Sequence, residues 1–320
     1  MDFNDIFEKC LVSEVVTQEN FNEQMYLENN QDVKKAVINK QIPNGKHHFT
    51  NYGKNESRKQ SNLLKINDMR NKKKKAFEKI LDKSLPFIEK DNKFNFLSEE
   101  LREKFSIIDT ENVSSNSYDG HVLQLIEENK NGLILDCGAG LGDVYFSNVV
   151  NYEIVDYITT DIVGVGEKLP FLDNSFDGVV SIAVLEHVKD PFLCAKEISR
   201  VLKPGGKLVC SVPFLQPFHG YPHHYFNMTS EGIKTLFDKY LKIERQLVDP
   251  SIYPIFALNW FLNSWANGLP DIEKEKFMNM SIRDICKDPF QQLNQDYVKL
   301  LPEEKNFELA SGTILIARKE

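Results

Sequence analysis

The segment 133–143 joins a short apolar run to three closely spaced glycines, Gly138, Gly140 and Gly142. The run 133–136 has the length and composition of a buried strand. Glycine lets the backbone turn sharply and approach a ligand closely, and a helix beginning after such a turn would present free N–H groups. The segment therefore predicts a strand, a ligand-binding turn and a following helix in an α/β fold.

From residue 120 onward, short apolar runs alternate with stretches of helical periodicity, which is typical of βαβ units around a parallel sheet. The expected strands are 133–136, 149–153, 161–165, 178–182, 207–212, 242–248 and 312–318. The expected helices are 121–129, about 190–202 and 229–240. We predict a seven-stranded Rossmann-like sheet whose last two strands pair antiparallel.

The chain has 320 residues, more than the roughly 150 that are usual for one domain. We expect a helical module over 1–60, a helical linker or cap over 61–115 with helices at about 68–84 and 97–105, and the α/β domain over 116–320. The stretch 250–311 reads as a helical insertion before the last strand, acting as a lid or as a homodimer contact. In the N-terminal module, His47 and His48 are expected to be packing residues.

Charge and cysteine usage restrict the class of protein. The net charge of −8 disfavours a nucleic-acid-binding protein, and the basic run 72–75 is too short to reverse this. The five cysteines form no C-x-x-C pair, so we expect reduced core residues in a cytoplasmic protein. The apolar stretch 252–269 is interrupted by proline and asparagines, so no membrane span is expected.

The glycine spacing separates two kinds of nucleotide site. A dinucleotide-binding turn has the pattern G-x-G-x-x-G, whereas the third glycine here falls one position early. Asp136, two positions before the first glycine, suits a ligand that carries an ammonium group. Both observations disfavour the alternative of a dinucleotide-dependent oxidoreductase.

Four segments in sequence order resemble the class I S-adenosylmethionine (SAM)-dependent methyltransferases of the type 11 group. They are 133–143, 164–180 with Leu-Pro-Phe, 181–191 with Leu-Glu-His, and 198–208 with Lys-Pro-Gly-Gly. The resemblance implies a methyltransferase sheet and SAM as cofactor. The helical pattern over 26–58 resembles a small module found in bacterial glycan-related and surface-associated proteins. The loop 213–227 resembles loops of a methyltransferase subgroup often linked to surface-polysaccharide synthesis.

The resemblance also implies roles for individual residues around SAM. Asp136 would hold the methionine ammonium group, and Glu153 would accept the ribose hydroxyls. The remaining expected contacts are the turn Cys137, Gly138, Ala139 and Gly140 for the methionyl and ribose parts, Gly166 and Glu167 for adenine, and Ala183 for the sulfonium end. Because the first helix would be short, Asp161 is an alternative ribose acid.

The loop 213–227 follows an expected parallel strand, at the end where such sheets bind ligands. It carries His219 and His224, which we predict as candidate bases, because a hydroxyl acceptor benefits from a base near neutrality. His187 is a third candidate. Some O-methyltransferases hold a divalent metal with a Glu-x-x-Glu-His run and a later histidine, but Ala183 stands at the first position here, so no metal site is predicted.

These observations predict SAM-dependent O-methylation of a sugar hydroxyl in a glycan or glycan precursor. The alternatives are methylation of an amine or another small molecule, the oxidoreductase considered above, and a catalytically silent scaffold. A silent scaffold is expected to lack an intact ribose acid and glycine turn, and this chain has both.

Overall fold

The computed structural model describes residues 8–109, 113–115, 117–220 and 223–318. Its centre is a seven-stranded sheet, parallel except for the antiparallel pair β4–β5 at one edge. In spatial order the strands are β11 (Leu202–Ser211), β10 (Phe176–Ile182), β6 (Ile134–Cys137), β8 (Val149–Glu153), β9 (Ile162–Val163), β5 (Lys93–Asn95) and β4 (Ile88–Lys90). The prediction of an α/β fold with a seven-stranded, mostly parallel sheet is confirmed.

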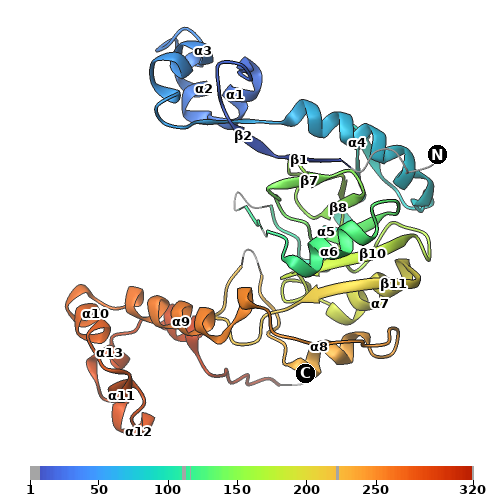
Figure 1. Cartoon of the computed structure of the whole chain (residues 1–320). Helices are drawn as coiled ribbons and strands as arrows, with labels where there is room; N and C mark the ends of the chain where they lie inside the picture. Colours follow the sequence, from blue (N-terminus) through green and yellow to red (C-terminus); the bar gives the residue numbers. More distant parts are fainter. Residues whose placement is uncertain (1–7, 110–112, 116, 221–222, 319–320) are drawn as a thin grey trace.

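Two of the seven strands come from an unexpected part of the chain. β4 and β5 belong to the segment expected to be a helical linker, and β5 lies parallel to β9 (Figure 1). The stretches 242–248 and 312–318 form no strand, so these two predictions were wrong. Their apolar alternation favours an extended backbone, but a strand also needs an edge to pair with, and this pattern cannot specify that edge.

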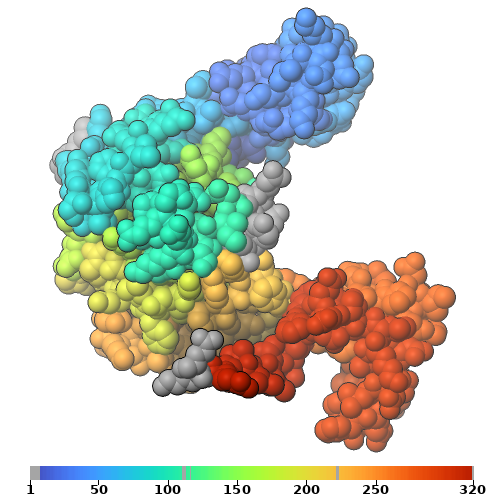
Figure 2. Space-filling view, turned by 180° about the vertical axis from the view of Figure 1, so that it is seen from behind, coloured from blue at the N-terminus to red at the C-terminus, as the bar shows by residue number. Residues whose placement is uncertain are grey.

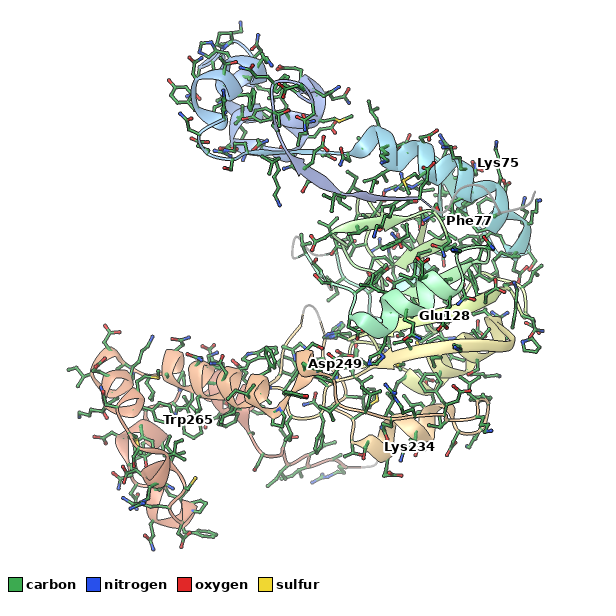
Figure 3. The ribbon with its side chains drawn as sticks, in the orientation of Figure 1. Lys75, Phe77, Glu128, Lys234, Asp249 and Trp265 are labelled. Atoms are coloured by element: carbon green, nitrogen blue, oxygen red, sulfur yellow. The ribbon has the colours of Figure 1, made fainter. Side chains whose placement is uncertain are left out.

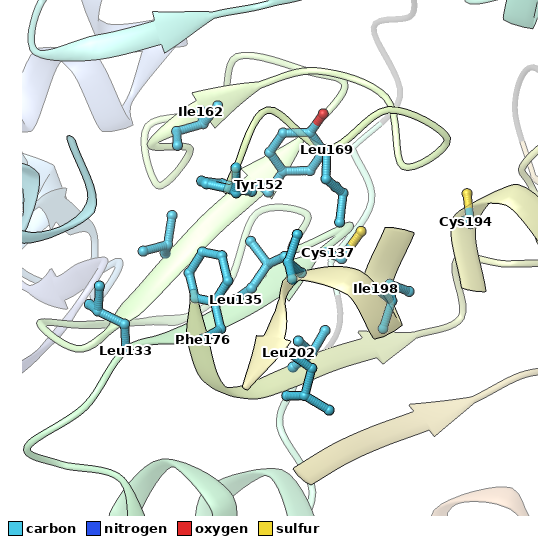
Figure 4. Packing of buried hydrophobic residues seen from close by; sticks show 14 of the residues in the cluster. Leu133, Leu135, Cys137, Tyr152, Ile162, Leu169, Phe176, Cys194, Ile198 and Leu202 are labelled. Carbon is cyan, nitrogen blue, oxygen red and sulfur yellow. The ribbon is translucent and has the colours of Figure 1, made fainter. Parts of the chain in front are cut away.

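Helices cover both faces of the sheet because successive strand residues point to opposite sides. Ile134 packs with α6 (Gly120–Glu128), whereas Leu135 packs in the larger cluster with α7 (Pro191–Val201) and α8 (Ser230–Phe237). Figure 4 shows Leu135 and Cys137 beside Tyr152 in that larger cluster. The three helices predicted for this domain are therefore confirmed, with small differences at their ends.

No helix follows the glycine turn, which corrects a second expectation. The chain instead forms the short strand β7 (Val144–Phe146), which pairs antiparallel with β1 (Lys9–Leu11). The stretch 138–148 between β6 and β8 is too short for a helix with a turn at each end, since a helical crossover between parallel strands needs a dozen or more residues. Pairing with β1 supplies hydrogen bonds to this shortened connection.

The helix α4 (Leu63–Phe77) is tied to the sheet by buried charges. Asp161, at the start of β9, lies 3.2 Å from Arg70 Nε and 2.6 Å from Lys73 Nζ, and all three side chains are almost completely buried. Asp161 also accepts hydrogen bonds from the Tyr145 hydroxyl and from the Asn151 N–H. In Figure 3 the end of α4, marked by the labelled Phe77, lies against the central domain. The carboxylate of Asp161 is therefore committed to this contact.

The N-terminal helices pack around a small cluster of their own. They are α1 (Glu23–Asn29), α2 (Gln31–Ile38), α3 (Gly45–His48) and the π-helical turn η2 (Phe49–Gly53), with β2 (Ser13–Val15) paired to β3 (Lys59–Ser61). His48 Nδ1 lies 2.9 Å from the Tyr26 hydroxyl inside this group, whereas His47 is exposed. In Figure 1 these helices stand away from the central sheet.

The remaining helices belong to the linker and to the region after β11. They are η3 (Glu78–Ile80), α5 (Glu99–Phe105), η4 (Pro250–Ile252), α9 (Pro254–Gly268), α10 (Asp271–Met278), α11 (Ile282–Ile285), α12 (Pro289–Gln292), α13 (Asp296–Lys299) and α14 (Glu303–Leu309). The helices α9, α10, α13 and α14 contribute to a separate cluster that includes Phe277 and Leu301. Figure 2 shows them as one arm and the N-terminal helices as another, with open space between the arms. None of the helices within the described ranges is both long enough and apolar enough to cross a bilayer.

Candidate functional site

The glycine turn follows the carboxyl end of β6. This strand lies between β10 and β8 in the sheet. Gly138 and Gly140 have φ angles of 91° and 59°, in the left-handed region that favours glycine. A Cβ atom on Gly138 would lie 2.4 Å from Val184 Cγ2, and one on Gly140 would lie 2.7 Å from the Ser114 carbonyl oxygen. Neither position has room for a side chain, so the turn requires both glycines.

Glu153 lies directly against this turn, at the end of the neighbouring strand β8. Its Oε2 atom accepts a 2.8 Å hydrogen bond from the Gly140 N–H, and Oε1 accepts one of 2.7 Å from the Ile154 N–H. Each carboxylate oxygen has a second lone pair for a ligand hydroxyl. Burial raises the pKa of Glu153 above its usual value, although these N–H donors favour the charged form.

Asp136 is a buried carboxylate beside the same turn. The Tyr118 hydroxyl donates a hydrogen bond to its Oδ2 atom, and within the described ranges no cationic side chain lies within ion-pair distance of it. Burial raises the pKa of Asp136 to about 7. A cationic ligand group would relieve this desolvation, so the environment fits an ammonium group. Sequence reasoning missed Tyr118, because a lone tyrosine before a helix has no distinguishing pattern.

Gly166 and Glu167, which the sequence suggested as adenine contacts, are held by contacts within the protein. Glu167 Oε1 accepts hydrogen bonds of 3.1 and 3.4 Å from the N–H groups of Lys189 and Asp190, and so connects the turn after β9 to the start of α7. A Cβ atom on the neighbouring Gly166 would lie 2.9 Å from Cys194 Sγ. Glu167 therefore has a positioning role, and its contact with adenine stays a prediction.

Ala183 and Asp161 are the two remaining residues that the sequence suggested for SAM binding. Ala183, directly after β10, has a φ of 54°, which costs an alanine about 1 kcal/mol. Such strain at the end of a strand next to the glycine turn is typical of a functional position. Asp161 is committed to Arg70 and Lys73, so Glu153 remains the acidic residue at the turn.

The predicted histidines come together near the cofactor turn. Val184 packs against Gly138, and the His187 N–H bonds the Val184 carbonyl at 2.9 Å. The ring centroids of His187 and His219 are 5.3 Å apart, and those of His219 and His224 are 4.2 Å apart. The loop after β11 thus returns to the turn after β10, as the position of both strand ends predicts.

Hydrogen bonds to backbone carbonyls fix the tautomers, because a carbonyl oxygen can only accept. His187 Nδ1 donates to the His223 oxygen at 2.7 Å, and His219 Nδ1 donates to the Pro217 oxygen at 2.9 Å. Each therefore keeps an Nε2 lone pair. Burial lowers the pKa of His187, which favours this neutral form.

His224 differs from the other two. Its Nδ1 accepts a 2.9 Å hydrogen bond from the His219 N–H, and its Nε2 lies 3.0 Å from Asn227 Oδ1, to which it donates. Both ring nitrogens are engaged, so His224 positions His219 and is not itself available as a base. Asn227 is fixed in turn by a bond to the Gln216 carbonyl. Tyr221, considered with Asn227 as a sugar contact, lies outside the described residues.

Aromatic side chains border the cluster. The Trp260 ring of α9 lies 5.0 Å from the His219 ring, and the Phe218 ring lies 5.4 Å from that of His224. The Phe218 N–H also bonds the Glu308 carbonyl of α14. The helices after η4 therefore reach the histidine loop at α9 and α14, whereas Trp265 lies farther out on the same arm (Figure 3).

Comparison with known proteins gives the glycine turn its context. A protein family described as a methyltransferase domain matches residues 135–210, which include the turn, Asp136, Glu153 and His187. The stretch 135–210 thus resembles a methyltransferase domain.

The similarity to curated relatives is confined to short stretches. A demethylmenaquinone methyltransferase of Staphylococcus haemolyticus is 41% identical over 75 residues, which is 22% of this chain and 31% of that protein. An uncharacterized methyltransferase of Schizosaccharomyces pombe is 45% identical over 58 residues, 18% of this chain and 21% of that protein. The chain thus spans about a fifth to a third of the length of these two relatives.

Solved structures overlap more of the chain at lower identity. The YcgJ protein of Bacillus subtilis is 18% identical with a TM-score of 0.32, covering 52% of this chain and 86% of that one. The Haemonchus contortus phosphoethanolamine N-methyltransferase 2, solved with S-adenosyl-L-methionine, is 19% identical with a TM-score of 0.31, covering 55% and 44%. The family match over 135–210 supports an enzyme of the methyltransferase type, for which SAM is the expected cofactor.

The residues at the turn fit this cofactor. Asp136 would pair with the ammonium group, and the two glycines leave the backbone open to the methionyl chain. Glu153 keeps lone pairs for the ribose hydroxyls. These assignments give two predictions.

Glu153→Ala is expected to weaken SAM binding by about 1.5–3 kcal/mol, because a charge-assisted contact to the ribose is lost. Isothermal titration calorimetry measures the change. Glu153→Gln is the matched variant, since its amide oxygen can still accept from the Gly140 N–H, and it should lose less. Equal, undiminished affinity in both variants would contradict the ribose role.

The affinity for SAM is expected to fall as the pH drops through about 7, because Asp136 then becomes protonated and no longer attracts an ammonium group. The other groups acting on this carboxyl are Tyr118, which lowers its pKa, and Glu153, which raises it. Titration calorimetry between about pH 6 and 8 should show up to a tenfold loss per pH unit below the pKa. In Asp136→Asn the affinity should be weaker, and this dependence should be lost.

Proposed function

We propose that the chain transfers the methyl group of SAM to a hydroxyl oxygen of a small-molecule acceptor, a sugar in a glycan or glycan precursor. The observation that carries this proposal is the pair of Nε2 lone pairs on His187 and His219, connected to the glycine turn through Val184. An alcohol is a poor nucleophile near neutral pH unless a base takes its proton, whereas a neutral amine needs no such help.

SAM supplies an activated methyl group when it is bound. The acceptor oxygen forms its new bond to the methyl carbon as the bond from carbon to sulfur breaks, and the hydroxyl proton passes to a histidine Nε2. His219 is the better placed base, because it lies on the loop after β11, where an acceptor would approach. Correct alignment of the acceptor can contribute about 7–11 kcal/mol to lowering the barrier.

The aromatic border supports a sugar as acceptor. Trp260 and Phe218 lie against the histidine rings, and the polar groups beside them include the ring nitrogens and the Asn227 side chain. Flat aromatic surfaces pack well against the apolar faces of sugar rings, while polar atoms between them bind the hydroxyls. We assign α9 as a wall of the acceptor site, and a homodimer through 250–311 stays a prediction.

The test is transfer of labelled methyl groups from SAM to panels of sugar nucleotides, oligosaccharides and amines. Methylated sugar with stoichiometric release of S-adenosylhomocysteine is the expected result. Transfer to amines alone would contradict the proposal. Binding of NAD without binding of SAM would contradict the assignment of the domain itself.

A further inference from the structure

Three side chains with metal-binding atoms converge beside the acceptor loop. Glu186 and His187 follow β10, and His219 lies on the loop after β11. One ligand atom from each lies within 4.8 Å of the others. The sequence predicted no metal site because Ala183 stands where a glutamate would be needed, and it could not place His219 near the other two.

The carboxylate of Glu186 is a second, independent observation. The side chain is fully buried, and neither oxygen has a hydrogen-bond partner among the described residues. Buried carboxylates normally have hydrogen-bond donors or a cation beside them, because burial of an isolated charge is costly. The ionisable side chain beside it is His187, whose Nε2 atom lies 3.8 Å from Glu186 Oε1. Among the described residues, the carboxylate therefore has neither a hydrogen-bond donor nor a permanent positive charge beside it.

The two imidazoles are held as metal ligands usually are. Each donates its Nδ1 proton to a backbone carbonyl, so Nε2 carries the lone pair. A histidine that binds a metal typically donates its other ring N–H in this way. Gly220, with a φ of 92°, makes the arrangement possible, since a Cβ atom there would lie 2.4 Å from His187 Cε1.

We propose that Glu186, His187 and His219 bind one divalent transition-metal ion, such as Zn²⁺ or Co²⁺. Two nitrogens and one carboxylate suit these ions and leave coordination positions open, whereas Mg²⁺ and Ca²⁺ prefer oxygen ligands only. The binding site does not depend on the proposed function. Its use does. With the ion bound, His219 Nε2 is a ligand and no longer takes the hydroxyl proton; the cation instead would attract the acceptor oxygen and make its proton acidic enough to pass to solvent.

The experiment is titration of the full-length chain, without a polyhistidine tag and after treatment with a chelator, with Co²⁺ and Zn²⁺ by calorimetry and visible absorption. The wild type should bind one equivalent. Glu186→Gln and His219→Gln should each weaken this binding by at least about 100-fold. His223→Gln and His47→Gln are the matched controls and should bind as the wild type does. His223 is in the same loop but bonds the Ser106 carbonyl, and His47 is exposed on the N-terminal helices.

Thermal unfolding provides a readout that does not need catalysis. The ion should raise the melting temperature of the wild type but not that of Glu186→Gln, and the metal-free variant should be no less stable than the metal-free wild type, because a buried, unpartnered charge has been removed. Absence of stoichiometric binding, or binding that survives Glu186→Gln, overturns the proposed site. Failure of sugar methylation with one equivalent of metal bound would count against the proposed function and leave the site standing.

Discussion

Asp161→Asn is expected to lower the free energy of unfolding by about 3–5 kcal/mol, because Arg70 and Lys73 then remain buried without a negative charge. The loss should appear in urea denaturation followed by circular dichroism. Burial already lowers the pKa of Lys73 to about 8 with Asp161 present, which shows how costly the charged form is at this position.

The matched control is Glu128→Gln. Glu128 forms a 2.9 Å ion pair with Lys207, but both side chains are exposed, so its loss should cost less than about 1 kcal/mol. Folded Asp161→Asn should still bind SAM with unchanged affinity, because the Asp161 carboxylate is engaged by Arg70, Lys73, Tyr145 and Asn151, none of which belongs to the glycine turn. A selective loss of SAM affinity with normal stability would instead restore the alternative of Asp161 as the ribose acid.

His219→Gln is expected to lower kcat about 10²–10⁴-fold while the affinity for SAM stays unchanged. The reason is that His219 lies on the acceptor loop and has a lone pair on Nε2, whereas the contacts expected for SAM lie on the glycine turn and Glu153. The measurement is methyl transfer to an acceptor found in the labelled screen, together with calorimetry of SAM binding.

Two variants make this result interpretable. His47→Gln, outside the domain, should have normal turnover. His224→Gln should have an intermediate effect, because His224 supports the His219 backbone and has no free ring nitrogen. Equal losses of turnover and of SAM affinity in His219→Gln would indicate that the histidine only maintains the shape of the site.

The glycine turn and the carboxylates beside it could largely be predicted from sequence. Gly138, Gly140, Asp136 and Glu153 all lie within or beside one turn, and three of the four are separated by only a few residues. Local backbone rules govern such a turn, because a positive φ without room for a Cβ atom allows only glycine. The matched family covers this same stretch.

The edges of the sheet could not be predicted in the same way. The pattern of 312–318 favours an extended backbone, and yet Ile314, Leu315 and Ile316 are at least 90% exposed and pair with no strand. β5, with a weaker pattern, does form a strand, because β9 offers it a parallel edge. Strand formation depends on a partner, and the choice of partner is a property of the assembled fold.

The sequence by itself determined the α/β class, the ligand-binding turn and the carboxylates beside it, because those features follow from residues that are close along the chain. Only the tertiary structure decided that Asp161 pairs with Arg70 and Lys73, and that His219 meets Glu186 and His187. The free energy of a buried charge depends on which groups surround it in space, and those groups come from distant parts of the chain.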